Sequence, residues 1–156
     1  MKIYISGSIS SVSEEFAREW RDDVSQKLLA LGYVVVDPYI MHIASGKPHN
    51  LVKELKHTDL KTHNDLVSTI VDDDLKWLSG CQAVLARIEN NVFSGAGVAG
   101  ELTLAKYLHI PVFASVEVDP VVVPSWMLGC ITKISSSLDE AIRCLNGSKI
   151  KPTSNQ

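Results

Sequence analysis

The chain has 156 residues, 46% of them hydrophobic and 21% charged, and it carries a formal net charge of −3. This length allows one domain with a hydrophobic core that needs no staples, and the composition is ordinary for a soluble globular protein. Because no basic stripe and no apolar run of membrane-spanning length occurs, neither nucleic acid nor a membrane is expected as a partner.

The three cysteines, Cys81, Cys130 and Cys144, are widely spaced and form no CxxC pattern. This usage is typical of reduced core thiols in a cytoplasmic protein. The amino-terminal segment MKIYISGSIS is too short and too polar for a secretory signal peptide, which also favours a cytoplasmic location.

Hydrophobic periodicity and turn residues predict alternating strands and helices. In chain order we expect a strand over residues 2–6, a helix over 13–31, a strand over 33–37, a short helix around 49–57, a helix over 65–79, a strand over 83–88, a helix over 98–109, a strand over 110–116, an edge strand over 130–135 and a helix over 137–146. Ser13 suits the start of the first helix and Gly32 its end. The remainder of 39–64 is left unassigned, and 148–156 is expected to be a disordered tail.

The strands are runs of Val and Ile rather than alternating patterns, which is typical of a parallel sheet covered on both faces. We therefore expect an α/β fold of three layers in a single domain over residues 1–147. Its core is a doubly wound, Rossmann-like or flavodoxin-like, mostly parallel five-stranded sheet with helices on both faces. In such sheets ligands bind beyond the carboxyl ends of the strands. Three stretches fall there: GSISS after the first strand, the DP pair after the second, and ENNVFSGAGVAGE after the third.

Glu101 follows the glycine-rich stretch SGAGVAG and lies on a predicted helix. It shares one face of that helix with Val98, Ala105 and Leu108, so we expect it to be at least partly buried near the helix start. The helix dipole favours its ionised form and desolvation opposes it, which would leave a poised carboxylate. A helix-capping role is the alternative.

Asp74 repeats this pattern, because it lies on the apolar stripe of its helix between Val71 and Leu78. Its neighbours Asp72 and Asp73 are expected to face solvent or the rim, as in an ordinary solvated acidic run. Metal binding by the run is weakly supported, because consecutive carboxylates on a helix diverge and no histidine has ligand spacing. Two inward carboxylates at one end of a sheet are what cleavage of a glycosidic bond requires, about 5 Å apart in retaining enzymes.

Other stretches give weaker signals. The GSISS turn could cradle a phosphate but lacks the lysine of a P-loop, and Gly95, Gly97 and Gly100 have dinucleotide spacing too late in the chain. Tyr4 could present its hydroxyl at the sheet end, or be an ordinary core tyrosine. The five histidines form no metal spacing, and His42 is a weak pocket candidate because it follows the second strand.

Four segments in order resemble the nucleoside 2-deoxyribosyltransferase superfamily, and among its branches the 2'-deoxynucleoside 5'-phosphate N-hydrolases. They are YISGSI (residues 4–9), DLKWL (74–78), SGAGVAGEL (94–102) and SWM (125–127). The resemblance covers roughly residues 2–135. Ser10 stands where that branch often has a basic residue, and the glycine loop is one residue longer before its Glu.

The resemblance implies that Glu101 is a nucleophile that forms a covalent glycosyl-enzyme, with Asp74 assisting the departing base and Tyr4 bonding near the nucleophile. It implies no metal or organic cofactor, and a homodimer in which the late Ser serves the neighbouring site. The residues expected to bind substrate, chiefly its 5'-phosphate, are Gly7, Ser8, Ile9, Ser10, Ser11, Ser94, Gly95, Gly97, Ser125 and Met127.

The leading functional hypothesis is a hydrolase of deoxynucleoside 5'-monophosphates. A deoxyribosyltransferase that passes the sugar to a second base is the alternative, and a hydrolase of ribonucleotides is a third. A non-catalytic nucleotide-binding module is also compatible with the fold. The absence of a match to the carboxyl-terminal segment of the transferases mildly favours hydrolysis.

Overall fold

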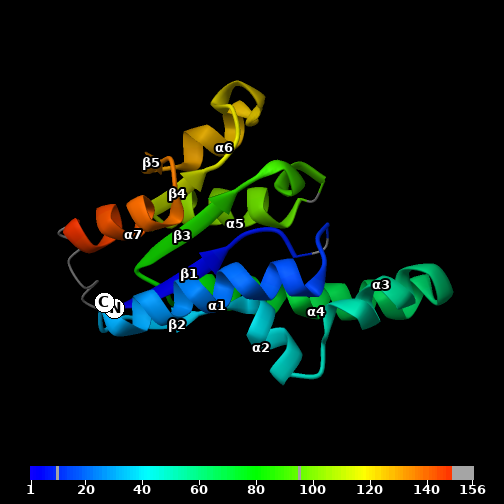
Figure 1. Ribbon diagram of the computed structural model, residues 1–156. Helices are drawn as coiled ribbons and strands as arrows, with labels where there is room; N and C mark the ends of the chain where they lie inside the picture. The colour runs from blue at the N-terminus through cyan, green and yellow to red at the C-terminus, as the bar shows by residue number, and fades with distance from the viewer. Residues whose placement is uncertain (10, 95, 149–156) are drawn as a thin grey trace.

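The computed structural model describes residues 1–9, 11–94 and 96–148, and for Ser94 the backbone only (Figure 1). Five strands form one sheet in the order β2-β1-β3-β4-β5, and every neighbouring pair is parallel. The expected α/β fold is confirmed, and the sheet is entirely rather than mostly parallel. The strands are β1 (Lys2–Ser6), β2 (Val34–Val36), β3 (Ala83–Ile88), β4 (Val112–Val116) and β5 (Lys133–Ser135).

The helices confirm most of the predicted elements. They are α1 (Glu14–Ala30), α2 (Pro38–Ala44), α3 (His49–Thr58), α4 (Leu60–Ser79), α5 (Gly97–Tyr107), α6 (Ser125–Cys130) and α7 (Leu138–Gly147), with 3-10 turns η1 (Asn90–Ser94) and η2 (Pro120–Val122). Ser13 caps α1 by accepting from the amide of Phe16, and Gly32 follows the helix at φ +82°. Both are the roles expected of them.

The structure differs from the sequence-based expectation at α2, α4 and α6. Helices α2 and α6 have seven and six residues, too few to show a 3.6-residue periodicity. Helix α4 begins five residues before the predicted start, because the side chain of Asp59 caps it by accepting from the amide of Thr62. The predicted edge strand 130–135 is shorter, since α6 ends at Cys130. Residues 149–156 of the expected tail lie outside the described residues.

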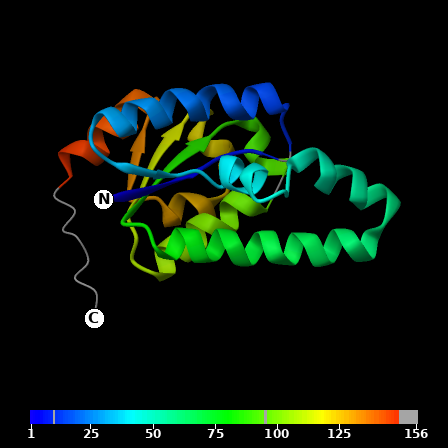
Figure 2. The same cartoon turned by 90° about the horizontal axis from the view of Figure 1, so that it is seen from below.

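Two hydrophobic layers sandwich the sheet, as Figure 2 shows from below. Helices α1 and α7 cover one face, where Val24, Leu28 and Leu145 pack on Ile3 and Ile5. Helices α4, α5 and α6 cover the other. Helix α3 packs on the first half of α4, and the two project beyond the sheet as a helical hairpin. The pocket described below lies where this hairpin meets the sheet.

The alternation of side chains along β1 decides which residues reach each layer. Ile3 and Ile5 face α1, whereas Tyr4 and Ser6 point to the opposite face, where α4 and α5 lie. Because β1 is an interior strand, between β2 and β3, and helices cover both faces, both sets are fully buried. A hydroxyl on Ser6 at 0% exposure needs a hydrogen-bond partner in the core, and α5 supplies it.

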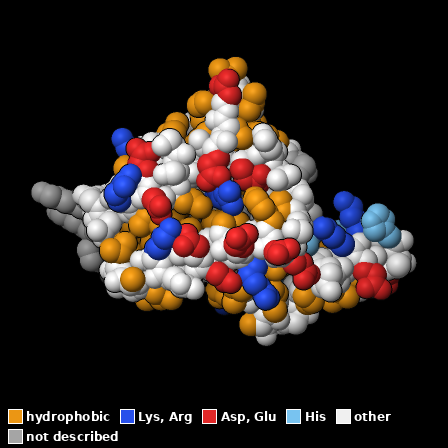
Figure 3. All heavy atoms as spheres, viewed as in Figure 1, with side chains coloured by type: hydrophobic (Ala, Val, Ile, Leu, Met, Phe, Trp, Pro, Cys, Tyr) orange, Lys and Arg blue, Asp and Glu red, His pale blue; other side chains and the backbone are white. Residues whose placement is uncertain are grey.

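Charged side chains on the face seen in Figure 3 are mixed in sign, with Lys and Arg interspersed among Asp and Glu over α1 and no continuous basic band among the described residues there. Within the described ranges, no helix is both long and apolar enough to cross a membrane. All three cysteines are free thiols, as expected, and burial raises the pKa of Cys81 to about 11.

We predict that Gly7→Ala destabilises the protein. A Cβ at Gly7 would lie 2.6 Å from Cζ2 of Trp20, and this indole is only 7% exposed, so it has little room to move. Overpacking of this kind costs about 1–3 kcal/mol. Urea denaturation would measure it. Gly147→Ala at the end of α7 is the control, because its Cβ also meets nothing within 4 Å and it lines neither pocket. The control should change the stability by less than about 1 kcal/mol, and equal stability of the two variants would contradict the clash.

Candidate active site

A pocket of about 340 Å³ opens where β1 and β3 end. It lies between β1 and β3. From β1 the chain continues to β2 on one side, and β3 begins the other half of the sheet, so this is the topological switch point where α/β proteins bind ligands. The loop after β1 and the start of α5 form its floor, and α2 and α4 form its walls. Its volume suits a small organic molecule.

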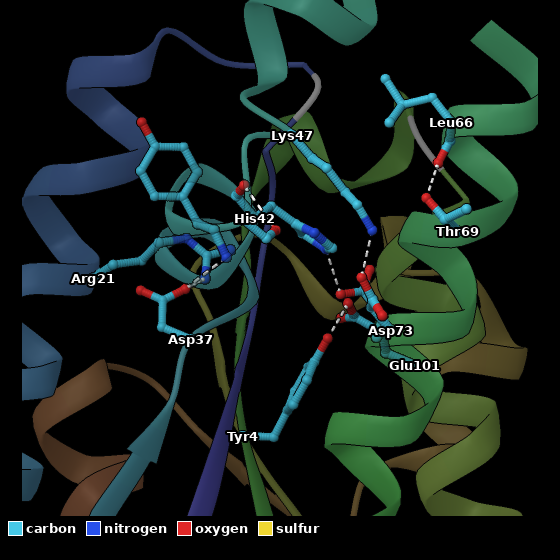
Figure 4. Close-up of polar contacts among 12 residues, drawn as sticks. Tyr4, Arg21, Asp37, His42, Lys47, Leu66, Thr69, Asp73 and Glu101 are labelled. Carbon is cyan, nitrogen blue, oxygen red and sulfur yellow. Dashed lines mark hydrogen bonds and ion pairs between the residues drawn. The ribbon is translucent and has the colours of Figure 1, made fainter. Parts of the chain in front are cut away.

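Glu101 of α5 lines this pocket and is held by two hydroxyl groups of β1. Figure 4 shows one of them, the hydroxyl of Tyr4, pointing toward Glu101. The hydroxyl of Tyr4 donates to Oε1 of Glu101 at 2.8 Å, and Oγ of Ser6 donates to Oε2 at 2.5 Å. The side-chain period of two along a strand places both hydroxyls on the face toward α5. Each carboxylate oxygen therefore has one fixed donor and keeps lone pairs for a second partner.

The pKa of the Glu101 carboxyl is raised to about 7. Burial is the main cause and the negative charge of Asp74 adds to it, while the hydrogen bonds from Ser6 and Tyr4 and the charge of Arg21 oppose the shift. Burial also raises the pKa of Tyr4, as do the charges of Glu101 and Asp74, so its hydroxyl stays a donor. A carboxylate with a pKa near neutral, in a cleft, is a candidate functional group.

Asp74 of α4 lines the same pocket and is bound by His42 of α2. Oδ1 of Asp74 lies 2.8 Å from Nε2 of His42, whose ring packs on Trp77 at a centroid distance of 4.8 Å. One residue earlier, Asp73 accepts from Nζ of Lys47 at 2.6 Å. Asp73 is therefore held at the rim rather than solvated, and two polar contacts join α4 to α2 and the loop that follows it.

A buried arginine holds the loop that follows β1. Arg21 of α1 is fully buried, its Nη1 lies 2.8 Å from Oδ1 of Asp37, and its Nη2 donates to the carbonyl of Gly7 at 2.8 Å. Its guanidinium also lies 4.6 Å from the ring of Trp20. Burial raises the pKa of Asp37 although Arg21 opposes the shift. Asp37, in the predicted DP stretch, thus caps α2 and anchors the loop but does not line the pocket.

The loop after β1 is also fixed from β3. Ser8 is buried, and its hydroxyl donates to Oε1 of Glu89 at 2.5 Å. Oε2 of Glu89 accepts from the amide and the side chain of Asn91. Ser11 donates to the carbonyl of Asn91 at 2.8 Å. The hydroxyl hydrogens of Ser8 and Ser11 are therefore both donated to protein groups, so what these described residues offer a ligand is chiefly their backbone.

Most of the residues predicted for the site meet in this pocket. Glu101 and Asp74 line it, Tyr4 contacts Glu101 from below, and Gly7, Ser8, Ile9, Ser11 and Gly97 line it as well. Ser125 and Met127 do not: Ser125 is exposed on α6, and Met127 is buried in the core. Ser10, Gly95 and the side chain of Ser94 lie outside the described residues.

Sequence reasoning missed Ser6, Arg21 and Glu89 as site-supporting residues. The signal for Ser6 was present, because it lies two residues after Tyr4 on the same face of a strand. Arg21 lies in a predicted helix and Glu89 in a predicted loop, and neither stands out there. Their supporting role is visible only from their buried hydrogen-bond partners, Asp37 and Ser8. The sequence gives no assignment for most of residues 39–64. In the structure this segment forms a wall of the pocket, and it supplies Tyr39, His42, Lys47, His49 and Val52.

Among the described residues, no group of three or more His, Cys, Asp or Glu side chains is arranged to hold a metal ion. The pocket combines two acids, two hydroxyl donors and an apolar wall of α4 made by Val67, Ile70 and Val71. Such an arrangement can perform acid, base or nucleophilic chemistry on a ligand with an apolar, planar part.

Among three comparisons with known proteins, the one with solved structures gives a match. No protein-family model and no curated protein sequence matches the chain. A solved structure of a 2-deoxyribosyltransferase from the psychrotolerant bacterium Bacillus psychrosaccharolyticus is similar, with a TM-score of 0.63 and 17% sequence identity over 97% of this chain and 98% of that chain. The two proteins share their fold over essentially their full lengths.

We predict that Glu101 makes the stability of the protein depend on pH. Its pKa of about 7 in the folded state lies above its ordinary value of 4.5, so the folded state binds the proton more tightly than the unfolded state between these values. The free energy of unfolding should therefore fall as pH rises from 4.5 to about 7. The difference should be about 1–3 kcal/mol, at about 1.4 kcal/mol per pKa unit.

Urea denaturation of the wild type and of Glu101→Gln across this range would test the prediction. The amide cannot ionise, so the stability of the variant relative to the wild type should rise with pH and level off above about pH 7. Glu19→Gln on the exposed surface of α1 is the control and should show no such trend. Parallel curves for wild type and Glu101→Gln would contradict the assignment.

Proposed function

We propose that this protein cleaves the N-glycosidic bond of (deoxy)nucleoside 5'-monophosphates and releases a free base and (deoxy)ribose 5-phosphate. The single observation that supports this best is the Glu101 carboxylate, oriented by Tyr4 and Ser6 in the same pocket as a second acid, Asp74. The shared fold with a 2-deoxyribosyltransferase and the four resembling segments support the same class of substrate. The proposal places the chain in the nucleoside 2-deoxyribosyltransferase superfamily.

In the first step, an oxygen of Glu101 attacks C1' of the sugar, and the bonding electrons of the N-glycosidic bond leave with the base. In this reacting state Glu101 is the anion and the one proton of the acid pair lies on Asp74, which gives it to a ring nitrogen or oxygen of the base, so that the base leaves neutral. The donors Tyr4 and Ser6 keep the carboxylate in one orientation and lower the entropy lost in reaching the reacting geometry. The product is a covalent glycosyl-enzyme.

In the second step, a water molecule attacks C1' and the bond from C1' to Glu101 breaks, with the electron pair returning to the carboxylate. The Asp74 carboxylate accepts a proton of the water and is ready for another cycle. The same two hydroxyls, Tyr4 and Ser6, stabilise the carboxylate as it leaves, because both donate to the oxygens that regain negative charge.

The sugar phosphate would lie against the loop after β1. Because the hydroxyls of Ser8 and Ser11 bind protein groups, we propose that the backbone amides of residues 7–9 contact the phosphate rather than these side chains. Gly7 allows this backbone to lie close to Trp20 and its carbonyl is fixed by Arg21, so the loop is held in position before substrate arrives. The base would then stack against the apolar wall of α4.

A deoxyribosyltransferase is the second candidate, because the similar structure belongs to such an enzyme. It would use the same nucleophile, and a second base rather than water would attack the glycosyl-enzyme. A ribonucleotide hydrolase would differ in accepting the 2'-hydroxyl. A non-catalytic binding module is disfavoured, because partly burying Glu101 near a second acid raises its pKa and costs stability that simple binding does not require.

We further propose a homodimer formed through α5 and α6. A groove there is lined by Ala96, Ala99, Gly100, Thr103, Leu104, Tyr107 and Trp126. Trp126 is 69% exposed and Tyr107 78% exposed, which is unusual for large aromatic side chains. Ser125 begins α6 beside this surface and outside its own pocket, as expected for a residue that serves the neighbouring site.

Glu101→Gln should lose at least about 1,000-fold in turnover, since an amide is a poor nucleophile. The assay incubates the protein with deoxynucleoside and ribonucleoside monophosphates and the matching nucleosides, with and without an acceptor base, and follows base release by chromatography. Mass spectrometry of quenched wild type should find the sugar phosphate on the peptide that contains Glu101. Glu19→Gln should retain full activity.

Each outcome of this set of substrate assays supports one of the candidate functions. Base release from monophosphates without an acceptor supports the hydrolase, and exchange only with an acceptor, or activity on nucleosides alone, supports the transferase. If the wild type turns over none of these compounds, the non-catalytic binding module is the candidate function that remains.

Trp126→Glu should convert the homodimer to a monomer, because a charge in the buried centre of an apolar interface is costly. Sedimentation velocity would measure the mass. If the partner's Ser125 completes the site, turnover should fall with the loss of the dimer. An active wild-type monomer at assay concentration would contradict the proposed dimer. Val121→Glu, on an 88% exposed side chain outside the groove, is the control.

A further inference from the structure

We propose that His42 is a positioning residue that directs the proton of Asp74 toward the departing base. This inference rests on the proposed function, and it assigns a role to a histidine that the sequence marked only as a weak pocket candidate. The contact that carries it is the 2.8 Å separation between Nε2 of His42 and Oδ1 of Asp74, inside the pocket that both residues line.

The surroundings of the His42 ring determine which nitrogen carries its hydrogen. The side chain is 9% exposed and packs against Trp77, so its ring nitrogens have little access to water. Nδ1 is buried and finds no hydrogen-bond partner among the described residues. An N–H at that atom would be buried without an acceptor, which costs about 1–3 kcal/mol. The hydrogen is therefore assigned to Nε2, which donates it to Asp74.

This tautomer fixes the role of each oxygen of Asp74. Oδ1 accepts the hydrogen bond from His42, so this oxygen is not free to carry a proton toward the base. The proposed step needs one proton on the acid pair before the base leaves. Because Oδ1 is held by His42, the oxygen of Asp74 that can carry this proton to the base is Oδ2. Glu101 is in the same pocket, and its charge interacts with that of Asp74. The two acids are thereby given different tasks, attack for Glu101 and proton donation for Asp74.

The proton and electrons of the step balance as follows. The proton moves from Oδ2 of Asp74 to the base, the electrons of the N-glycosidic bond go to the base, and an oxygen of Glu101 bonds to C1'. His42 keeps its hydrogen throughout, and its hydrogen bond to Oδ1 strengthens as Asp74 becomes an anion. In the hydrolytic step a proton of the attacking water returns to Oδ2, and the starting state is restored.

The fold places His42 through a series of fixed contacts. Asp37 caps α2 and is bound by the buried Arg21, so the start of α2 is anchored to α1 and to the loop of Gly7. His42 lies five residues further on the same helix. The pair Lys47–Asp73, at 2.6 Å, holds the segment after α2 to α4 on the other side. Figure 4 shows His42 between these two contacts, Arg21 with Asp37 and Lys47 with Asp73. Because both ends of the segment are held, the imidazole meets Asp74 in one orientation.

The test compares two His42 variants on two kinds of substrate. His42→Phe keeps a flat ring and removes the donor, while His42→Gln keeps an amide N–H near the position of Nε2. One substrate is a normal deoxynucleoside monophosphate that the wild type cleaves. The other is N7-methylated deoxyguanosine monophosphate, whose base is cationic and leaves without receiving a proton. His57→Phe, on an exposed histidine of α3, is the matched control.

The rate of base release in the first turnover isolates the step that needs the acid. His42→Phe should lower this rate on the normal substrate at least about 10-fold, a part of the roughly 100-fold or more that general acid catalysis supplies, and change it on the methylated substrate by less than about 3-fold. Asp74→Asn should show the same selectivity in this rate, and His42→Gln should recover much of the lost activity. Equal losses on both substrates, or no rescue by Gln, would mean that His42 only supports the fold and would overturn the proposal.

A second measurement does not depend on turnover. Nitrogen-15 NMR of the histidine side chains in the wild type should show His42 with its hydrogen on Nε2, and Asp74→Asn should shift that signal. A hydrogen on Nδ1 would overturn the proposal even in an active enzyme. If the NMR result is as expected but the wild type cleaves neither substrate, the contact stands, and it is the proposed function that has failed.

Discussion

The structure depends on a carboxylate, Glu101, that the fold partly buries at the end of a parallel sheet and holds with two hydroxyl groups. Burying such a group is unfavourable unless its charge is met by donors, and Tyr4 and Ser6 meet it from adjacent inward positions of β1. The residual cost appears as a pKa of about 7. The interior strand β1 supplies the donors and the first half of α5 supplies the acid, so the site forms only when these two elements pack.

The remainder of the pocket is arranged around that carboxylate by further buried polar contacts. Arg21 fixes the carbonyl of Gly7 and the cap of α2, while Glu89 fixes Ser8 from β3. Each contact joins different elements, and together they hold Gly7 and Ser8 at the end of β1 in place. A preformed loop lowers the entropy lost when a ligand binds. The apolar wall of α4 and the segment after β2 close the other side.

Two acids in one pocket are useful only if they differ in role. Glu101 receives hydroxyl donors on both oxygens, whereas Asp74 receives an imidazole on one oxygen. In the proposed chemistry the first environment suits a nucleophile and the second a proton donor.

The sequence by itself determined the order of strands and helices, because long runs of Val and Ile and 3.6-residue apolar stripes are local properties of the chain. It also singled out Glu101 and Asp74, since an acid on an apolar helix face is visible in a single helix, and Tyr4 through the YISGSI segment. It missed α2 and α6 because helices of seven and six residues have no readable period. Only the tertiary structure decided the partners of the acids. Ser6 lies 95 positions from Glu101 and His42 lies 32 positions from Asp74, and such contacts arise from packing between elements, which no local pattern encodes.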